Sequence, residues 1–174
     1  MIRRWLGWIG LLGLCIGCIC GCAQGGKTAQ EPVTTGFSCD TAISYQDLSI
    51  EGHLTRKSAG MLELEFKQPT TLQGVVMEWD GENLNMKMGG LSFGVDPSIL
   101  PDGALGQELL QALDAGFRAG EGGEVTEEGV HTSGTTVSGS FELISDPETG
   151  RLLSLSFPEQ GLKATFSNFQ LIGE

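Results

Sequence analysis

The sequence predicts a mainly β protein, a curved antiparallel sheet of about eight or nine strands that forms an open half-barrel with one amphipathic helix in its concave face. Two observations support this fold class. From residue 37 onward, short runs of alternating apolar and polar residues are separated by turn signals. One segment of helical spacing interrupts them. Alternation gives each strand one wet face, so the other must be buried, and the helix is the obvious cover.

The first strands are predicted over residues 37–43, 48–54, 61–67, 72–79, 84–88 and 91–93. The clearest is MLELEFK at residues 61–67, in which apolar side chains alternate with charged ones. Asp80-Gly81 predicts a hairpin turn between the fourth and fifth strands. Further strands are predicted over residues 135–145, 153–157 and 162–166, with turns at residues 146–151 and 158–161.

A single helix is predicted over residues 104–117. Leu105, Leu109, Ala112 and Leu113 recur there at helical spacing. Asp102 is placed to cap its start, and Gly116 lies near its end. The acidic, glycine-rich residues 120–129 are predicted to form a loop.

Residues 1–21 (MIRRWLGWIGLLGLCIGCICG) have the layout of a secretory signal peptide: a basic head, an uncharged apolar run and small residues before a cysteine. An uncleaved transmembrane anchor is the alternative, because the apolar run is about as long as the shortest bilayer span. Residues 22–36 contain Gly-Gly and a proline and are predicted to form a flexible tether. Residues 37–172 are then the folded domain.

Ile19-Cys20-Gly21-Cys22 resembles the lipobox of bacterial lipoproteins. The resemblance implies cleavage after Gly21 and a diacylglycerol on the Cys22 thiol, with Cys18 as the reserve acceptor. It also implies a palmitate-type lipid anchor on the extracytoplasmic face of the cell membrane. Two acyl chains are enough for stable anchoring.

The chain has 174 residues and a formal charge of −12. Without the signal segment, eight basic residues face 22 acidic ones, a charge of −14. Such a protein repels phosphate backbones, so the sequence predicts no nucleic-acid partner. Cys39 is the only cysteine after Cys22. It is interpreted as a small buried residue on an inward strand face, with a reactive thiol as the alternative.

Catalytic and metal motifs were sought, and the sequence predicts no enzyme, no cofactor and no metal site. Gly90-Leu91-Ser92-Phe93-Gly94 matches the letters of the G-x-S-x-G nucleophile elbow, but no helix directly follows it. His53 and His131 lack clustered partners for zinc. The glutamates of residues 121–128 lack the ligand spacing of an EF-hand loop.

Three short segments carry a family resemblance. Together with the order of elements, QPTTLQG at residues 68–74, Leu100-Pro101, and TGRL at residues 149–152 resemble the LolA/LolB-like lipoprotein-carrier superfamily. Within it, the chain is most similar to small Firmicutes lipoproteins, including the germination-type lipoproteins of clostridia. The resemblance implies an open, incomplete barrel whose apolar interior accepts acyl chains. An anchored chain would resemble the membrane-bound acceptor type more than a soluble carrier.

Two hypotheses follow for the function. In the first, the half-barrel binds a lipid acyl chain or another apolar ligand between sheet and helix. In the second, the same residues form an ordinary packed core, and the wet face or an exposed sheet edge docks a partner protein of the cell envelope. The candidate lining residues of the first hypothesis are Leu62, Leu64, Phe66, Val76, Leu109, Leu113, Phe141, Leu155, Phe157 and Phe166.

Overall fold

The structure is a computed structural model that describes residues 33, 36–58, 60–80, 83–96, 105–118 and 123–172. The predicted signal segment, Cys22 and the predicted capping residue Asp102 lie outside these ranges. Within them, no helix combines the length and the apolar character needed to cross a membrane. The elements are β1 (Phe37–Tyr45), β2 (Leu48–Ser58), β3 (Met61–Gln68), η1 (Thr70–Leu72), β4 (Val76–Trp79), β5 (Leu84–Met88), β6 (Leu91–Val95), α1 (Leu105–Arg118), β7 (Glu124–Val125), β8 (Val130–Thr136), β9 (Gly139–Ser145), β10 (Leu152–Phe157), η3 (Pro158–Gln160) and β11 (Leu162–Leu171).

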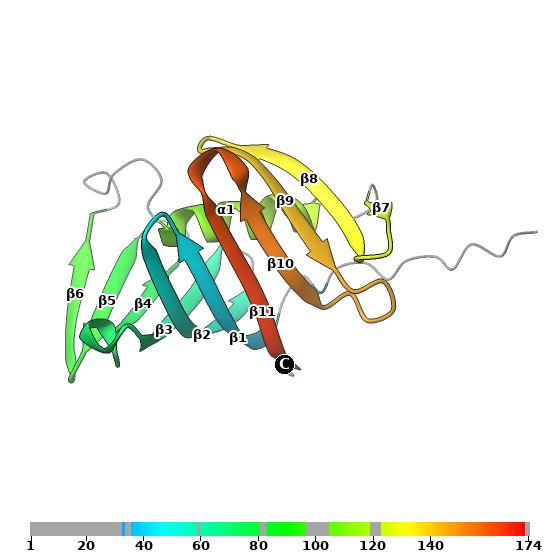
Figure 1. Cartoon of the computed structure of the whole chain (residues 1–174). Helices are drawn as coiled ribbons and strands as arrows, with labels where there is room; N and C mark the ends of the chain where they lie inside the picture. The colour runs from blue at the N-terminus through cyan, green and yellow to red at the C-terminus, as the bar shows by residue number, and fades with distance from the viewer. Residues whose placement is uncertain are drawn as a thin grey trace, which may run out of the picture.

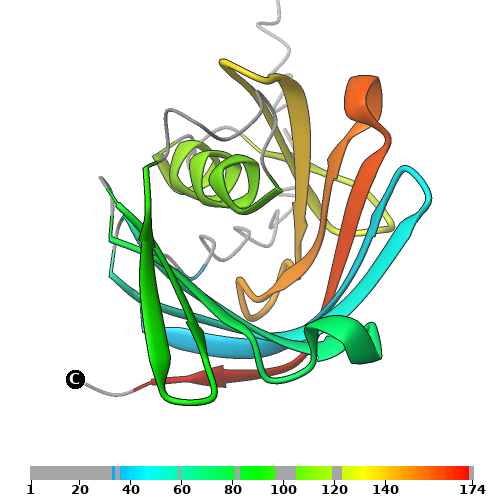
Figure 2. The same ribbon diagram turned by 90° about the vertical axis from the view of Figure 1, so that its left-hand side faces the viewer.

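All the described strands belong to one antiparallel sheet, in the order β6-β5-β4-β3-β2-β1-β11-β10-β9-β8-β7. The chain runs outward from β1 to β6 at one edge and continues through α1 to β7 at the other edge. It then returns strand by strand to β11, which pairs with β1. The sheet is strongly curved, and α1 lies on its concave side (Figures 1 and 2).

The predicted fold class is confirmed, but the sheet has 11 strands instead of eight or nine. The stretch predicted as one strand over residues 135–145 contains the end of β8, a turn and β9, and the first residues of β8 (130–134) were not predicted as a strand. The chain turns at Val137 and Ser138, where the Thr136 hydroxyl accepts the Ser138 N–H at 3.2 Å. Two residues of the predicted acidic loop form β7, and the predicted strand at residues 72–79 begins only at Val76, after η1.

The helix prediction is confirmed to within one residue at each end. Strand alternation places one side chain in two on the concave face, where the core forms. Phe37, Cys39, Thr41 and Ile43 of β1 are buried there, and the side chains that alternate with them point to the convex face. Val33, from the segment predicted as a tether, packs against this core and donates its N–H to the Gly150 carbonyl at 2.9 Å.

Candidate functional site

Nine of the ten candidate lining residues are buried in the hydrophobic core. Strand register puts the β3 residues Leu62, Leu64 and Phe66 in line with the concave side chains of β2. Leu109 and Leu113 come from the helix face that packs on the sheet. The remaining four are Phe141, Leu155, Phe157 and Phe166.

Val76 does not share this face. The register pairs it with Glu65 on β3 and Lys87 on β5, which are both convex-face positions. The concave position on β4 belongs to Met77, which pairs with Leu64. The placement of Val76 as a lining residue is therefore corrected: the inward positions of β4 are Met77 and Trp79, and the side chain of Val76 points to the other face.

Helix α1 seals part of the concave face by close contact at both of its ends. At the first turn, Gly106 lies flat against the indole of Trp79, leaving no room for a Cβ atom. At the other end, a Cβ on Gly116 would lie 2.6 Å from Leu143 Cδ2. The helix therefore bridges the sheet from β4 to β9, and glycine is needed where its backbone meets a large side chain.

A buried ion pair joins helix α1 to strand β2, near the middle of the sheet. Arg56 lies on the concave face of β2 with only 1% of its surface exposed. Its guanidinium donates a hydrogen bond to the half-buried carboxylate of Asp114 on α1. Sequence reasoning missed this pair, although Arg56 follows Leu54 at an inward position of the alternation. An inward charge requires a partner, since an uncompensated buried charge is costly.

A second buried charge lies in the first turn of α1. The Glu108 side chain is 1% exposed, and within the described part of the chain neither carboxylate oxygen has a hydrogen-bond partner of normal geometry. Burial raises the pKa of this carboxyl, and the nearby side chains of Gln160 and Ser138 offset part of that rise. The first turn of the helix thus buries a carboxyl group whose pKa is raised.

The concave face continues beyond the helix as an exposed apolar surface. The register aligns Leu84, Met86 and Met88 of β5 with Val95, Phe93 and Leu91 of β6, all on the concave side. Met88, Leu91 and Phe93 are 57%, 63% and 56% exposed. We call these three residues the open apolar face; Met77, Met86 and Val95 border it and pack against the core.

The sequence analysis did not single out the open apolar face. The available signal was the run of alternating apolar residues through residues 84–95. Methionine adapts its shape to different apolar partners, and contiguous exposed apolar surface commonly marks a binding site.

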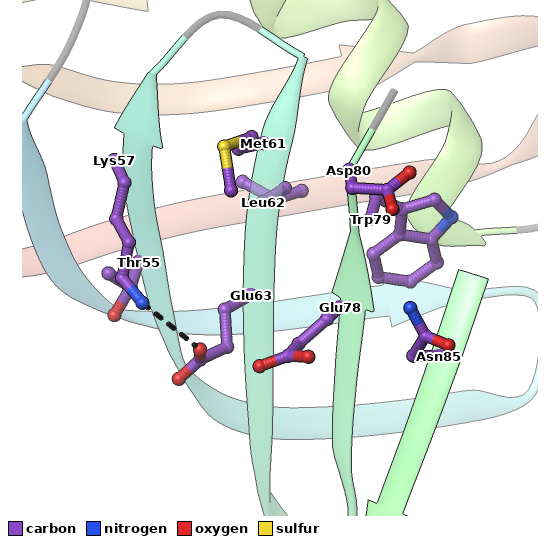
Figure 3. Close-up of a pocket in the computed structure, with 9 residues that line it drawn as sticks. All are labelled: Thr55, Lys57, Met61, Leu62, Glu63, Glu78, Trp79, Asp80 and Asn85. Atoms are coloured by element: carbon purple, nitrogen blue, oxygen red, sulfur yellow. Dashed lines mark ion pairs between the residues drawn. The ribbon is translucent and has the colours of Figure 1, made fainter. Parts of the chain in front are cut away.

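Two hollows lie near this end of the sheet. The first has a volume of about 160 Å³ and is lined by side chains of β2 to β5. Lys57 and Glu63 form an ion pair of 3.7 Å across its wall (Figure 3). It is small beside the roughly 300–1,000 Å³ of typical ligand pockets, so it does not fit an acyl chain.

The second hollow, of about 430 Å³, lies at the β5–β6 turn. Met88 and Leu91 of the open apolar face line it, together with Val76 from the opposite face of the sheet. Its volume falls within the usual range for small-molecule sites. Because Val76, Lys87 and Ser92 of its lining are convex-face positions, this hollow opens mainly on the face of the sheet opposite to the open apolar face.

The convex face carries a polar row across four strands. The Asp40 carboxylate accepts hydrogen bonds from His53 at 3.0 Å, Lys67 at 2.6 Å and Asn168 at 2.8 Å. The hydrogen bond from Asn168, followed by those from Lys67 and His53, holds the pKa of Asp40 well below its usual range. His131 likewise bonds Glu142 at 2.7 Å. Both histidines thus pair with carboxylates on the convex face.

The other chemical motifs take structural positions. Ser92 of the G-x-S-x-G match lies within strand β6, not at a strand-to-helix turn. Cys39 is buried, and burial followed by the neighbouring Asp40 charge raises the pKa of its thiol to about 12. In the ranges that the structure covers, no three His, Cys, Asp or Glu side chains are grouped so that they could hold a metal ion.

No family model and no curated protein matches the sequence. Solved structures resemble it in shape. An uncharacterized conserved protein from Thermus thermophilus aligns with a TM-score of 0.49 and 14% identity, over 82% of each chain. A LolA superfamily protein from Nitrosomonas europaea aligns at 0.44 and 12%, over 85% of this chain and 91% of that one. A DUF1329 family protein from Desulfovibrio piger aligns at 0.40 and 11%, over 79% and 86%.

Proposed function

We propose that the protein is an extracytoplasmic lipoprotein, anchored in the cell membrane through lipid on Cys22, that binds a lipid acyl chain or another apolar ligand without catalysis. The open apolar face carries this proposal. Met88, Leu91 and Phe93 continue the core-facing rows of the sheet but are not covered by α1. An apolar ligand bound there would remove their surface from water, which is favourable by about 25 cal/mol for each Å² buried.

The ligand would begin at the β5–β6 end and follow the concave face toward α1. Met77 and Met86, which border the open apolar face, can adjust their side chains to a flexible chain. The deeper residues of the first hypothesis, such as Leu64 and Leu155, are fully buried. We therefore assign the contact to the open apolar face and leave the deeper residues as core.

Native mass spectrometry tests the ligand. The chain from Cys22 to Glu174, with Cys22→Ser and without detergent, is expected to carry a co-purifying lipid or to take up added fatty acid. Replacing Leu91 and Phe93 together with lysine should abolish the adduct. Val137→Lys, which changes an exposed apolar residue on the β8–β9 turn, is the matched control and should retain it. A mass that stays free of adducts after addition of fatty acids and phospholipids would contradict the proposal.

Labelled palmitate tests the anchor in cells that express the full chain. Label should enter the wild-type protein, and Cys22→Ser should remove it and release the protein from the membrane fraction. Cys18→Ser is the matched control. Loss of label with Cys18→Ser alone would assign the lipid to that cysteine instead.

A second candidate function is docking of an envelope protein with no small ligand. Burial of nine of the ten candidate lining residues favours it, because a packed core leaves no interior pocket at those positions. An absence of lipid adducts, together with a folded domain, would support this reading.

A further inference from the structure

Strand β6 forms a free edge of the sheet. Among the described residues it pairs only with β5 and ends the strand order. Its sequence, LSFGV, contains no charge and no proline. The opposite edge strand, β7, has two residues, one of them Glu124. Proteins usually protect sheet edges with charges, prolines or very short strands, because a free edge pairs readily with another strand. β7 has such protection and β6 does not.

The backbone groups on this edge can be assigned from the hairpin geometry. Gly89 and Gly90 join β5 to β6 with φ angles of 57° and 84°, as in a two-residue type I′ turn. The flanking residues Met88 and Leu91 then form a hydrogen-bonded pair, and such pairs alternate along the ladder. The N–H and C=O groups of Ser92 and Gly94 therefore point away from β5, toward the free edge.

We propose that β6 pairs antiparallel with β6 of a second copy of this chain, in a dimer with a twofold axis beside Phe93. In this register Ser92 faces the partner's Gly94, so each outward N–H meets an outward C=O. On the concave side Leu91 faces the partner's Val95, and the two Phe93 side chains face each other. Two small residues meet on the convex side. The strand is thus complementary to itself under the twofold axis, as a closed symmetric interface requires.

The net charge of each copy and the surface area buried between the copies determine how strong this dimer should be. No like charges meet along the five paired residues, but each copy carries a formal charge of −12. Added salt screens that repulsion and should strengthen the dimer. If β6 instead bound a basic segment of another protein, added salt would weaken that complex. One strand from each copy buries less than the ~1,000 Å² of a stable interface, so the dimer should be weak and concentration-dependent.

Photo-cross-linking in cell membranes tests this inference on the full chain. The benzoyl analogue of phenylalanine replaces Phe93 in two co-expressed copies that carry different affinity tags. The expected product contains both tags, and peptide mapping places residues 91–95 of both copies at the cross-link. In isolated membranes the cross-linked fraction should rise with added salt. The dimer does not require a bound ligand, so a protein without lipid adducts can still give this product.

Substitutions at Ser92 separate edge pairing from chance collision. Ser92→Pro removes one outward N–H from each copy without removing a β5–β6 hydrogen bond, so the cross-linked fraction should fall by about tenfold or more. Ser92→Ala retains the backbone donor and should behave as the parent. Resistance to proteolysis shows whether each variant is folded. If Ser92→Pro does not fold, the salt dependence of cross-linking in the parent protein still tests the proposal. The proposal is overturned if no homodimer forms, or if the analogue at Phe93 cross-links only to lipid or to another protein. It is also overturned if the analogue placed at Val137 gives as much homodimer as the analogue at Phe93.

Discussion

The two ends of the concave face have the same alternation of apolar residues and opposite exposure. In the core that α1 helps to close, Leu143, Leu155 and Phe157 are fully buried. At the β5–β6 end, Leu91 and Phe93 have more than half of their surface in water. The helix packs chiefly on β8, β9, β3 and β4, so its position makes one end core and leaves the other end as surface.

The difference shows that strand alternation specifies a face, whereas a separate element decides whether that face becomes core. A side chain under the helix contributes to folding through its burial and packing. The same side chain at the β5–β6 end contributes little to folding and is available for binding. Substitutions matched between the two ends can measure this division directly.

The largest expected effect comes from placing a charge on each end. Leu109→Asp buries an unpaired carboxylate between helix and sheet and should lower the free energy of unfolding by about 3–5 kcal/mol. Leu91→Asp should change it by no more than about 0.5 kcal/mol, because its side chain is 63% exposed. Urea denaturation of both variants measures the difference. Similar losses at the two positions would mean that the β5–β6 end is also core.

A smaller effect is expected from adding one methyl group at each end. Gly106→Ala must displace the Trp79 indole, so overpacking of about 1–3 kcal/mol should exceed the gain of up to ~1 kcal/mol in helix propensity. At Gly94, a Cβ meets nothing nearer than Asn85 Oδ1 at 3.8 Å, so Gly94→Ala should be close to neutral. Trp79 fluorescence, read alongside the denaturation midpoint, should change only for Gly106→Ala. An unchanged spectrum and midpoint for that variant would show that α1 is not seated on Trp79.

The sequence was sufficient to predict the fold class and the single helix, because both depend on local periodicity. It underestimated the number of strands at Val137-Ser138, where Thr136 supports a tight turn without a proline or an Asn-Gly pair. Inward-facing residues such as Leu64 and Phe157 were predicted correctly from alternation. Val76 was not, because the alternation of β4 places Met77 and Trp79 inward and Val76 outward.

The candidate site was harder to predict because it depends on tertiary placement. Arg56 and Asp114 are 58 positions apart, and nothing local to either residue indicates the pairing. The open apolar face is exposed because α1 does not cover that part of the sheet. The sequence of the helix does not indicate which strands the helix will cover. The lipid anchor and the ligand stay predictions, since Cys22 lies outside the described residues and no ligand contact has been measured.

The smallest expected effect is a gain in stability at the covered end. Burial raises the pKa of Glu108, so the folded protein holds this proton more tightly than the unfolded chain does. The stability linked to the proton is fully present below the ordinary carboxyl pKa and is lost as the pH rises through the raised value. Glu108→Gln keeps the shape without the charge, so it should be more stable than the parent at neutral pH and lose this part of the pH dependence. Urea denaturation from about pH 4 to about pH 8 measures it, with Glu124→Gln on the exposed edge strand β7 as the matched control. If Glu108→Gln is instead less stable than the parent at neutral pH, the Glu108 carboxylate is satisfied in the folded protein, and the first turn of α1 is held by its charge.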